Sequence, residues 1–215
     1  MREISAFDWG NGTDQMKSTG KTHWERFSGA VAAGDDEQAE ALIPLLSASD
    51  RPRLLAMVLR GGDARWWAVR GLAQVGDDWA ILAVVACLED SNAAVRSVAA
   101  LAMAALYQRY PEDVQPFLPW LAALLTDNDG LVRQSAAAAL AQCGDGAVAA
   151  LADALNSPHE GVRVRAAAAL HRIGTIKTAA PLYHHLEDLN PLVRHYAYET
   201  LDKLGLLTNV LLTRV

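Results

Sequence analysis

One pattern recurs five times along the chain: an arginine opens an alanine-rich segment that has the spacing of a helix. The five arginines are Arg65, Arg96, Arg133, Arg163 and Arg194. Four of the segments close on a glycine eleven residues after the arginine, and successive arginines lie 31, 37, 30 and 31 residues apart. Self-similarity at about 30 residues is typical of a solenoid built from stacked helical hairpins.

The pattern predicts an all-α, right-handed superhelix of about five to six helical hairpins. Alanine favours helices and lets neighbouring backbones approach closely, and hydrophobic residues make up 52% of the 215 residues. We expect one solenoid over residues 21–215, with a degenerate first hairpin at 21–48, regular repeats at 50–205 and a capping helix at 206–215. Residues 1–20 are rich in Gly, Asn, Thr, Asp and Ser, which predicts a flexible or loosely docked leader.

The residues that close the segments predict sharp turns between helices. Glycine adopts the left-handed conformation that ends a helix at the lowest cost. We expect this conformation at Gly76, Gly144, Gly174 and Gly205. The following residue is expected to cap the next helix at Asp77, Asp145 and Thr175.

The overall charge and the cysteine content limit the classes of partner. The formal net charge is −6, whereas nucleic-acid binding needs a clustered basic face, so no nucleic-acid partner is expected. Cys87 and Cys143 fall in different segments, which predicts neither a disulfide nor a zinc site and favours a reducing cytoplasm. No apolar span of 18 residues is free of charge, so we expect no membrane anchor.

The repeats also share a spaced motif. It runs roughly Leu-x-Asp-x-x-x-x-Val-Arg-x-x-Ala-Ala-x-Ala-Leu-x-x-x-Gly, and one complete copy extends from Leu125 to Gly144. Ser157 replaces the aspartate in one repeat, and the first repeat keeps only its arginine, one leucine and its glycine. Over about residues 50–205 the pattern resembles HEAT repeats, in particular the short HEAT-like repeats associated with phycobilin lyases. The resemblance implies a HEAT/armadillo-like solenoid that serves as a scaffold, an adaptor or a lyase subunit.

The resemblance further implies a structural role for the aspartates and arginines, which form a ladder along the stack in this family. The expected ladder contains Arg65, Asp90, Arg96, Asp127, Arg133, Arg163, Asp188 and Arg194. In the same family the second helix of each hairpin lines the concave surface, which is the usual binding face.

Helical geometry predicts which side chains the second helices present on that face. Counted from the arginine, positions 3, 7 and 10 point inward and positions 1, 5, 8 and 9 point away. The outward positions include Ser97 and Ala104. The candidate partner contacts are Trp66, Arg70, Leu101, Gln134, His171, Arg172, His195 and, at the flank, Tyr196.

Two interpretations of the pair Trp66-Trp67 remain open. Adjacent residues of a helix diverge by 100°, so both rings cannot occupy the same inward stripe. In the first interpretation Trp67 lies at the seam between repeats and Trp66 covers the first hairpin. In the second, Trp66 and Arg70 anchor a partner, since Trp and Arg dominate interface hot spots.

Catalytic and metal-binding chemistry finds little support in the sequence. The HEAT-like deoxyhypusine hydroxylases hold two irons with several His-Glu pairs, but this chain has one such dipeptide, His159-Glu160. No metal site and no cofactor are predicted, and Ser97 and Ser135 lack a nucleophile elbow or a matched base. We therefore expect a non-enzymatic scaffold that binds another protein or an extended peptide, as a monomer or with weak self-association. The alternative is a phycobilin lyase-like or chromophore-binding enzyme subunit.

Overall fold

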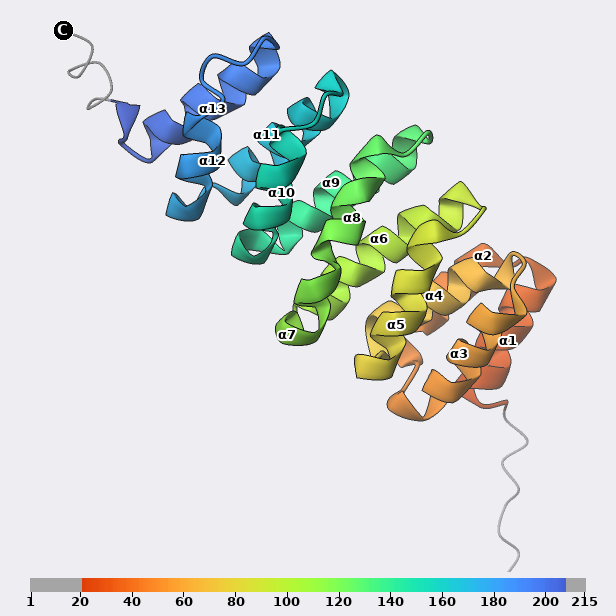
Figure 1. Cartoon of the computed structure of the whole chain (residues 1–215). Coiled ribbons are helices and arrows are strands. Elements are labelled where there is room, and N and C mark those ends of the chain that lie inside the picture. The colour runs from red at the N-terminus through yellow and green to blue at the C-terminus, as the bar shows by residue number, and fades with distance from the viewer. Residues whose placement is uncertain (1–20, 208–215) are drawn as a thin grey trace, which may run out of the picture.

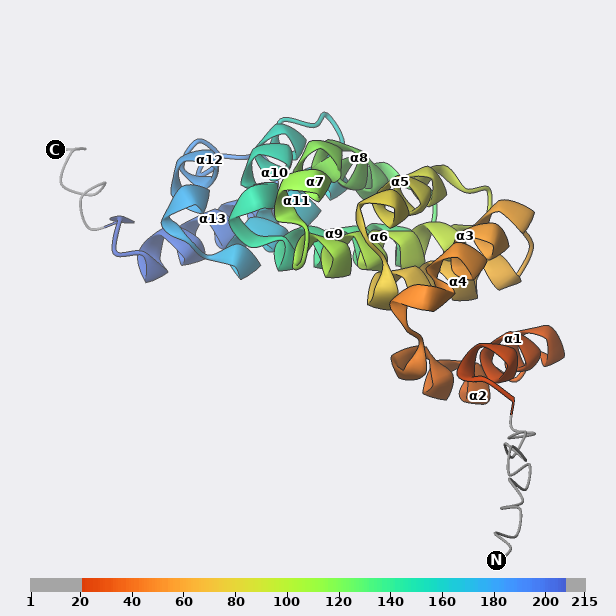
Figure 2. The ribbon, with the colours of Figure 1, turned by 90° about the horizontal axis from the view of Figure 1, so that it is seen from below.

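The computed structural model describes residues 21–207, which form helices and turns without any strand. Helical hairpins stack side by side into an elongated array (Figure 1). In the regular part of the array the first helices lie on one side and the second helices on the other, as Figure 2 shows. The predicted all-α solenoid is confirmed. The leader predicted at 1–20 and most of the capping helix predicted at 206–215 lie outside the described residues.

The first hairpin consists of α1 (His23–Ala33) and α2 (Asp36–Leu42), and Figure 2 shows it displaced toward the side of the second helices. The regular hairpins follow, each given as first helix and then second helix: α3 (Arg51–Arg60) with α4 (Ala64–Val75), α5 (Asp78–Ala86) with α6 (Ala93–Tyr107), α7 (Pro111–Val114) and α8 (Leu118–Ala123) with α9 (Gly130–Gln142), α10 (Val148–Leu155) with α11 (Glu160–Ile173), and α12 (Ala179–Tyr183) with α13 (Pro191–Lys203). Short 3-10 turns lie at Ile43–Leu45, Ala48–Asp50, Cys87–Glu89, Gln115–Phe117, Leu124–Thr126, Gly144–Ala147 and Ile176–Thr178.

Small side chains let the second helices pack closely against one another. The helices α4, α6, α9, α11 and α13 form a continuous row in which each helix contacts the next. Ala99, Ala136 and Ala167 on these helices are fully buried. The larger side chains seven residues after each arginine fill the core: Leu72, Met103, Leu140, Leu170 and Leu201.

Two positions of α6 contradict the predicted orientation. Ser97 and Ala104 are predicted to point away from the core, but only 6% and 0% of their surface is exposed. The prediction is wrong because α6 packs against both α4 and α9. Neighbours on two sides cover a wider sector of a helix than the stripe that faces its own hairpin partner.

The first helix of the third repeat is interrupted, as Pro116 and Pro119 predict. Proline lacks the backbone N–H, and its ring clashes with the carbonyl of the residue four positions earlier, so the chain forms α7, a 3-10 turn and α8. The hydroxyl of Tyr107, which stands where other repeats have the closing glycine, donates to Gln115 Oε1 (3.2 Å). Gln115 Nε2 donates to the carbonyl of Gly146 (2.8 Å), which ties the longer third repeat to the fourth.

Three closing glycines have the predicted left-handed conformation and one does not. The φ angles of Gly144, Gly174 and Gly205 are 58°, 60° and 70°. Gly76 has a φ of −65° and an extended backbone, so the prediction is wrong there. A Cβ atom on Gly76 would lie 2.4 Å from the carbonyl oxygen of Leu72. Glycine is needed at this position because the Leu72 carbonyl and Ala80 lie too close for a side chain, and not because the backbone is left-handed.

One of the three predicted helix caps is present. Asp77 accepts a hydrogen bond from the N–H of Ala80 (3.2 Å) at the start of α5. The predictions for Asp145 and Thr175 are wrong, because the Thr175 hydroxyl donates to Asp145 Oδ1 (2.5 Å) instead. This bond joins neighbouring repeats, so the two side chains stabilise the stack and not a helix end.

Replacing Gly76 with alanine is expected to lower the free energy of unfolding by about 1–3 kcal/mol, the usual cost of overpacking. The added methyl group would overlap the Leu72 carbonyl and lie 2.8 Å from the Cβ of Ala80. The measurement is the urea midpoint of the helical circular dichroism signal, which should fall.

The matched control is Gly29→Ala. Nothing lies within 4 Å of a Cβ atom on Gly29, which is inside α1. Alanine is preferred over glycine in a helix by about 1 kcal/mol, so this variant should unfold at the wild-type midpoint or above it. An unchanged midpoint for Gly76→Ala would show that the close approach at Gly76 does not limit stability.

Candidate functional site

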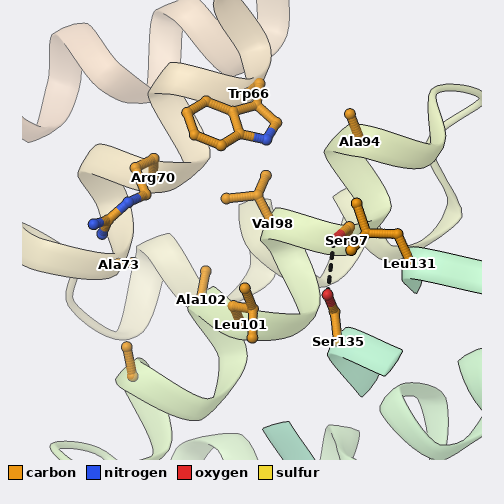
Figure 3. Close-up of a pocket in the computed structure, with 11 residues that line it drawn as sticks. Trp66, Arg70, Ala73, Ala94, Ser97, Val98, Leu101, Ala102, Leu131 and Ser135 are labelled. Carbon is orange, nitrogen blue, oxygen red and sulfur yellow. Dashed lines mark hydrogen bonds between the residues drawn. The ribbon is translucent and has the colours of Figure 1, made fainter. Parts of the chain in front are cut away.

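The face of the second helices carries a hollow between α4 and α6 that we call the apolar slot. Its volume is about 440 Å³ and its lining is mainly apolar. Figure 3 shows Trp66 of α4 next to Val98 of α6, with Leu101 one turn farther along α6. The slot is lined by Trp66, Arg70, Ala73, Ala94, Ser97, Val98, Leu101, Ala102, Ala105, Leu131 and Ser135.

The two adjacent tryptophans contact different neighbours. Their ring centroids lie 4.6 Å apart and the rings meet edge to face at 81°. Trp67 packs in a similar edge-to-face contact against Phe27 of α1, with 6.5 Å between centroids. Trp66 lines the slot together with Arg70 and Leu101. Three of the predicted partner contacts therefore share one surface.

Arg70 reaches from the slot to the first hairpin. Its Nη2 atom lies 2.6 Å from Glu40 Oε1 of α2, and 39% and 50% of the two side chains are exposed. An exposed ion pair of this kind contributes about 0–1 kcal/mol. A carboxylate of a bound molecule could therefore replace Glu40 at little cost.

The polar atoms at the base of the slot bond to each other. The hydroxyl oxygens of Ser97 and Ser135 lie 2.8 Å apart, and both residues are buried (Figure 3). Neither hydroxyl bonds to a histidine or a carboxylate of the described residues. The pair joins α6 to α9 and does not form a nucleophile with its base.

A second hollow, which we call the acidic hollow, adjoins the slot. It has a volume of about 610 Å³ and is lined by Asp36, Glu37, Glu40, Asp63, Trp66, Trp67, Asn92 and Ala94. Trp66 and Ala94 line both hollows, so the two form one continuous surface. Sequence reasoning missed the four acids because they lie outside the second helices. Asp63 immediately precedes α4, whereas Asp36, Glu37 and Glu40 lie on α2 and reach Trp66 through the way the first hairpin folds toward α4.

His171, His195 and Tyr196 form a separate cluster on α11 and α13. The His171 ring centroid lies 5.5 Å from that of Tyr196, and its Nδ1 lies 2.9 Å from the Thr200 hydroxyl. The His195 centroid lies 5.6 Å from that of Tyr196. Burial and then the charge of Lys203 lower the pKa of His171 below its ordinary value, which favours the neutral ring.

The other two predicted contacts, Gln134 and Arg172, are exposed on α9 and α11. Neither of them lines the slot or the acidic hollow. The eight predicted contacts thus do not converge on one site, and Trp66, Arg70 and Leu101 are the three that the structure brings together.

Arginines and aspartates of successive repeats form ion pairs along the turns inside the hairpins. The pairs are Arg65–Asp90, Arg96–Asp127 and Arg163–Asp188. In the second pair, Arg96 Nε and Nη2 lie 2.8 and 2.9 Å from the two oxygens of Asp127. Arg96 Nη1 donates to the carbonyl of Asp90 in its own turn (2.8 Å). Each of these arginines therefore connects its own repeat to the next.

A further ion pair, which the motif did not predict, joins Arg51 of α3 to Asp77.

These contacts lower the pKa of the aspartates in the ladder. Hydrogen bonds from Arg96 lower the pKa of Asp127 and outweigh the burial that would raise it, and the N–H of Asp129 also contributes. Burial would raise the pKa of Asp188 as well, but hydrogen bonds from Arg163 and from the N–H of Asn190 bring it below its ordinary value.

The ladder is interrupted at Arg133. Its Nη1 atom donates to the carbonyls of Asp127 (2.7 Å) and Asn128 (2.9 Å). Ser157 occupies the aspartate position of the next repeat. Arg133 Nε is buried and has no hydrogen-bond partner in the described part of the chain. Arg194 donates to backbone carbonyls of its own turn.

Three family models match the chain. They describe HEAT repeats at residues 117–202, non-SMC mitotic condensation complex subunit 1 at residues 78–147, and the PBS lyase HEAT-like repeat at residues 64–90. The chain is a HEAT-like repeat protein. The match to the PBS lyase type covers α4 and α5, and therefore Trp66 and Arg70.

One solved structure with a TM-score above 0.5 supports the fold, and two others are similar at lower scores. YibA from Escherichia coli is 19% identical, with a TM-score of 0.53 over 86% of this chain and 76% of that chain. The complex of CpcE and CpcF of phycocyanin lyase from Nostoc sp. PCC7120 is 19% identical, with a TM-score of 0.48 over 93% of this chain and 81% of that one. A designed armadillo repeat protein in complex with the peptide (KR)4 is 17% identical, with a TM-score of 0.47 over 82% and 97%. At these identities the likeness concerns the fold alone.

A comparison with curated proteins gives no significant match. Between residues 21 and 207, no group of three or more His, Cys, Asp or Glu side chains is placed to hold a metal ion. None of the helices in this part of the chain has the length and apolar character needed to cross a membrane.

Asp127→Asn is expected to lower the free energy of unfolding by about 3 kcal/mol at pH 7, because it leaves Arg96 without its partner. The folded-state pKa of Asp127 is lowered, so its contribution is complete above about pH 4 and is lost as the pH falls through the folded value. The difference between variant and wild type should therefore be largest near pH 7 and shrink as the pH falls below about 4, as urea unfolding at several pH values would measure.

Asp153→Asn serves as the control, because Asp153 is exposed on α10 and forms no ion pair with a described residue. It should unfold like wild type at every pH. A loss of stability for Asp127→Asn that does not change with pH would contradict the assignment to the ion pair.

Proposed function

We propose that this protein is a non-enzymatic scaffold that binds an extended segment of a partner protein on the face of its second helices. The observation that carries the proposal is the continuity of the apolar slot with the acidic hollow at Trp66. A solenoid offers such a surface in a fixed form, so the solenoid loses little conformational entropy when a partner binds.

The apolar slot supplies the anchor. Its volume of about 440 Å³ and its mainly apolar lining leave room for apolar side chains of a partner. Burial of a leucine-sized side chain contributes about 1.5–3 kcal/mol. The indole of Trp66 and the exposed side chain of Leu101 would contribute most, since 43% of Leu101 remains in contact with water in the free protein.

The acidic hollow supplies the charge preference. Glu40 is paired with Arg70, whereas Asp36, Glu37 and Asp63 form no ion pair within the described residues. Complementary charge guides encounter and excludes partners of the wrong sign. The partner segment should therefore carry Lys or Arg next to the apolar residue that enters the slot.

The remaining predicted contacts Gln134, His171, Arg172, His195 and Tyr196 would serve a partner that extends along the array to α13. They stay predictions, as do the cytoplasmic location and the monomeric or weakly associating state. The alternative is a chromophore-binding, phycobilin lyase-like subunit. The match of residues 64–90 to the PBS lyase HEAT-like repeat favours it, because this segment contains Trp66 and Arg70.

Selection from a displayed library of random extended peptides would test the proposed surface. Wild type is expected to enrich peptides with a large apolar residue beside Lys or Arg, and Trp66→Ala should weaken their binding by about tenfold or more, as a hot-spot tryptophan does. Glu37→Gln combined with Asp63→Asn should reduce the preference for basic residues while apolar selection remains.

The matched control is Trp79→Ala. Trp79 is a tryptophan of α5, on the side of the first helices, and 71% of it is exposed. Equal loss of binding in Trp79→Ala and Trp66→Ala would place the site elsewhere. Visible absorbance gained on mixing with an open-chain tetrapyrrole, and lost in Trp66→Ala, would favour the chromophore-binding alternative.

A further inference from the structure

The interruption of the ladder leaves the Arg133 guanidinium without a carboxylate partner on its Nε edge. In the two fully bidentate pairs, the Nε and Nη2 atoms of the arginine face the carboxylate of the next repeat. The distances are 2.8 and 2.9 Å for Arg96 and 2.9 and 3.2 Å for Arg163. Arg133 occupies the equivalent position of its repeat, so its Nε and Nη2 edge is directed to the place where a carboxylate would be expected.

The serine in the next repeat does not replace the carboxylate. The Ser157 hydroxyl accepts a hydrogen bond from the N–H of His159 (3.2 Å) and forms no bond with Arg133. Arg133 Nη1 is occupied by two backbone carbonyls of its own turn, and Nε is buried without a hydrogen-bond partner among residues 21–207. A buried donor without an acceptor is costly, because it has lost its hydration and gained nothing in return.

A hollow of about 330 Å³ surrounds this guanidinium on the edge of the stack formed by the turns inside the hairpins. Arg165 and His159 line it together with Arg133. Arg165 Nη1 donates to the carbonyl of Gly161 (2.7 Å), and Arg165 has no ion pair with a described residue. The carboxylate that also lines the hollow, that of Asp127, is already bonded by Arg96.

Two guanidinium groups therefore share a partly buried hollow without a carboxylate of their own. Burial and then the charge of Arg133 lower the pKa of Arg165, which shows that the two cations disfavour each other. The N-cap residue of α11, His159, makes no side-chain capping bond, and the carboxylate of Glu160 in the first turn of α11 is bonded by Asn190. An anion would relieve the repulsion and supply the acceptor that Arg133 Nε lacks.

We propose that this hollow binds an oxyanion, a carboxylate or a phosphate group, which bridges Arg133 and Arg165 and takes the place that aspartate holds in the other repeats. The planar fork of arginine matches both groups with two parallel hydrogen bonds. The site lies on the turns and not on the face of the second helices, so it is independent of the scaffold function proposed above.

Ser157→Asp is the decisive variant, because it attaches the carboxylate to the chain and makes it an internal competitor. The full-length wild type should melt at a higher temperature in phosphate than in chloride of equal ionic strength. At tenfold excess over Kd the expected rise is about 3–5 °C for a chain of this size. Ser157→Asp should melt higher than wild type in chloride and rise in phosphate only by the general stabilisation that phosphate gives to any protein surface.

Ser157→Asn, which has the same shape without the charge, should respond to phosphate like wild type. Comparing this control with Ser157→Asp allows the general stabilising effect of phosphate on protein surfaces, which all variants share, to be measured and subtracted. Arg165→Ala should weaken phosphate binding, measured by calorimetry, at least tenfold. Acetate tested in the same way distinguishes a site for carboxylates from one for phosphate alone.

The proposal fails if Ser157→Asp and Ser157→Asn gain equally in phosphate, or if neither acetate nor phosphate stabilises wild type more than Ser157→Asp. It also fails if Arg165→Ala binds phosphate as wild type does. The calorimetric result does not depend on the folding of Ser157→Asp, so either variant alone can overturn the assignment.

Discussion

The close packing of the alanine-rich second helices determines the geometry of the whole array. Because these helices are rich in small buried residues such as Ala99 and Ala136, each helix lies near enough to the next to share a hydrogen bond, as Ser97 and Ser135 do. The same spacing brings the arginine at the start of one second helix to the aspartate in the turn of the next repeat. Larger residues at these positions would separate the helices and break both contacts.

The acidic hollow follows from a departure from this regularity. The first hairpin is displaced toward the side of the second helices, and its helix α2 brings acidic residues next to Trp66 (Figure 2). Regular repeats alone would present a smooth row of small side chains. The apolar slot is formed by α4, α6 and α9 of the regular array, whereas the acidic hollow beside it exists because the degenerate hairpin meets this array at α4, where Arg70 bonds to Glu40.

Local and periodic features could be predicted from the sequence, and contacts between irregular segments could not. The arginine period predicts the solenoid, and the prolines at 116 and 119 predict the interrupted helix. The left-handed turn at Gly76 was predicted wrongly, since a glycine required for close approach has the same sequence signature as one required for handedness. The three acids that α2 places beside Trp66 could not be foreseen, because no repeat relates the first hairpin to α4. The substitution at Ser157 is visible in the sequence, but its effect on Arg133 Nε depends on the burial of that atom.

The uneven distribution of ion pairs also has a consequence for the way the array loses structure. In a linear stack each repeat is held mainly by its neighbours, so the weakest junction determines where cooperativity ends. Ion pairs cross the junctions between the first and second, second and third, and fourth and fifth repeats, and none crosses between the third and fourth among the described residues. This junction is held by the packing of α9 against α11 and by the hydrogen bond from Gln115 to Gly146. We therefore expect partial unfolding to begin at this junction, with α10 to α13 released together and α1 to α9 retained.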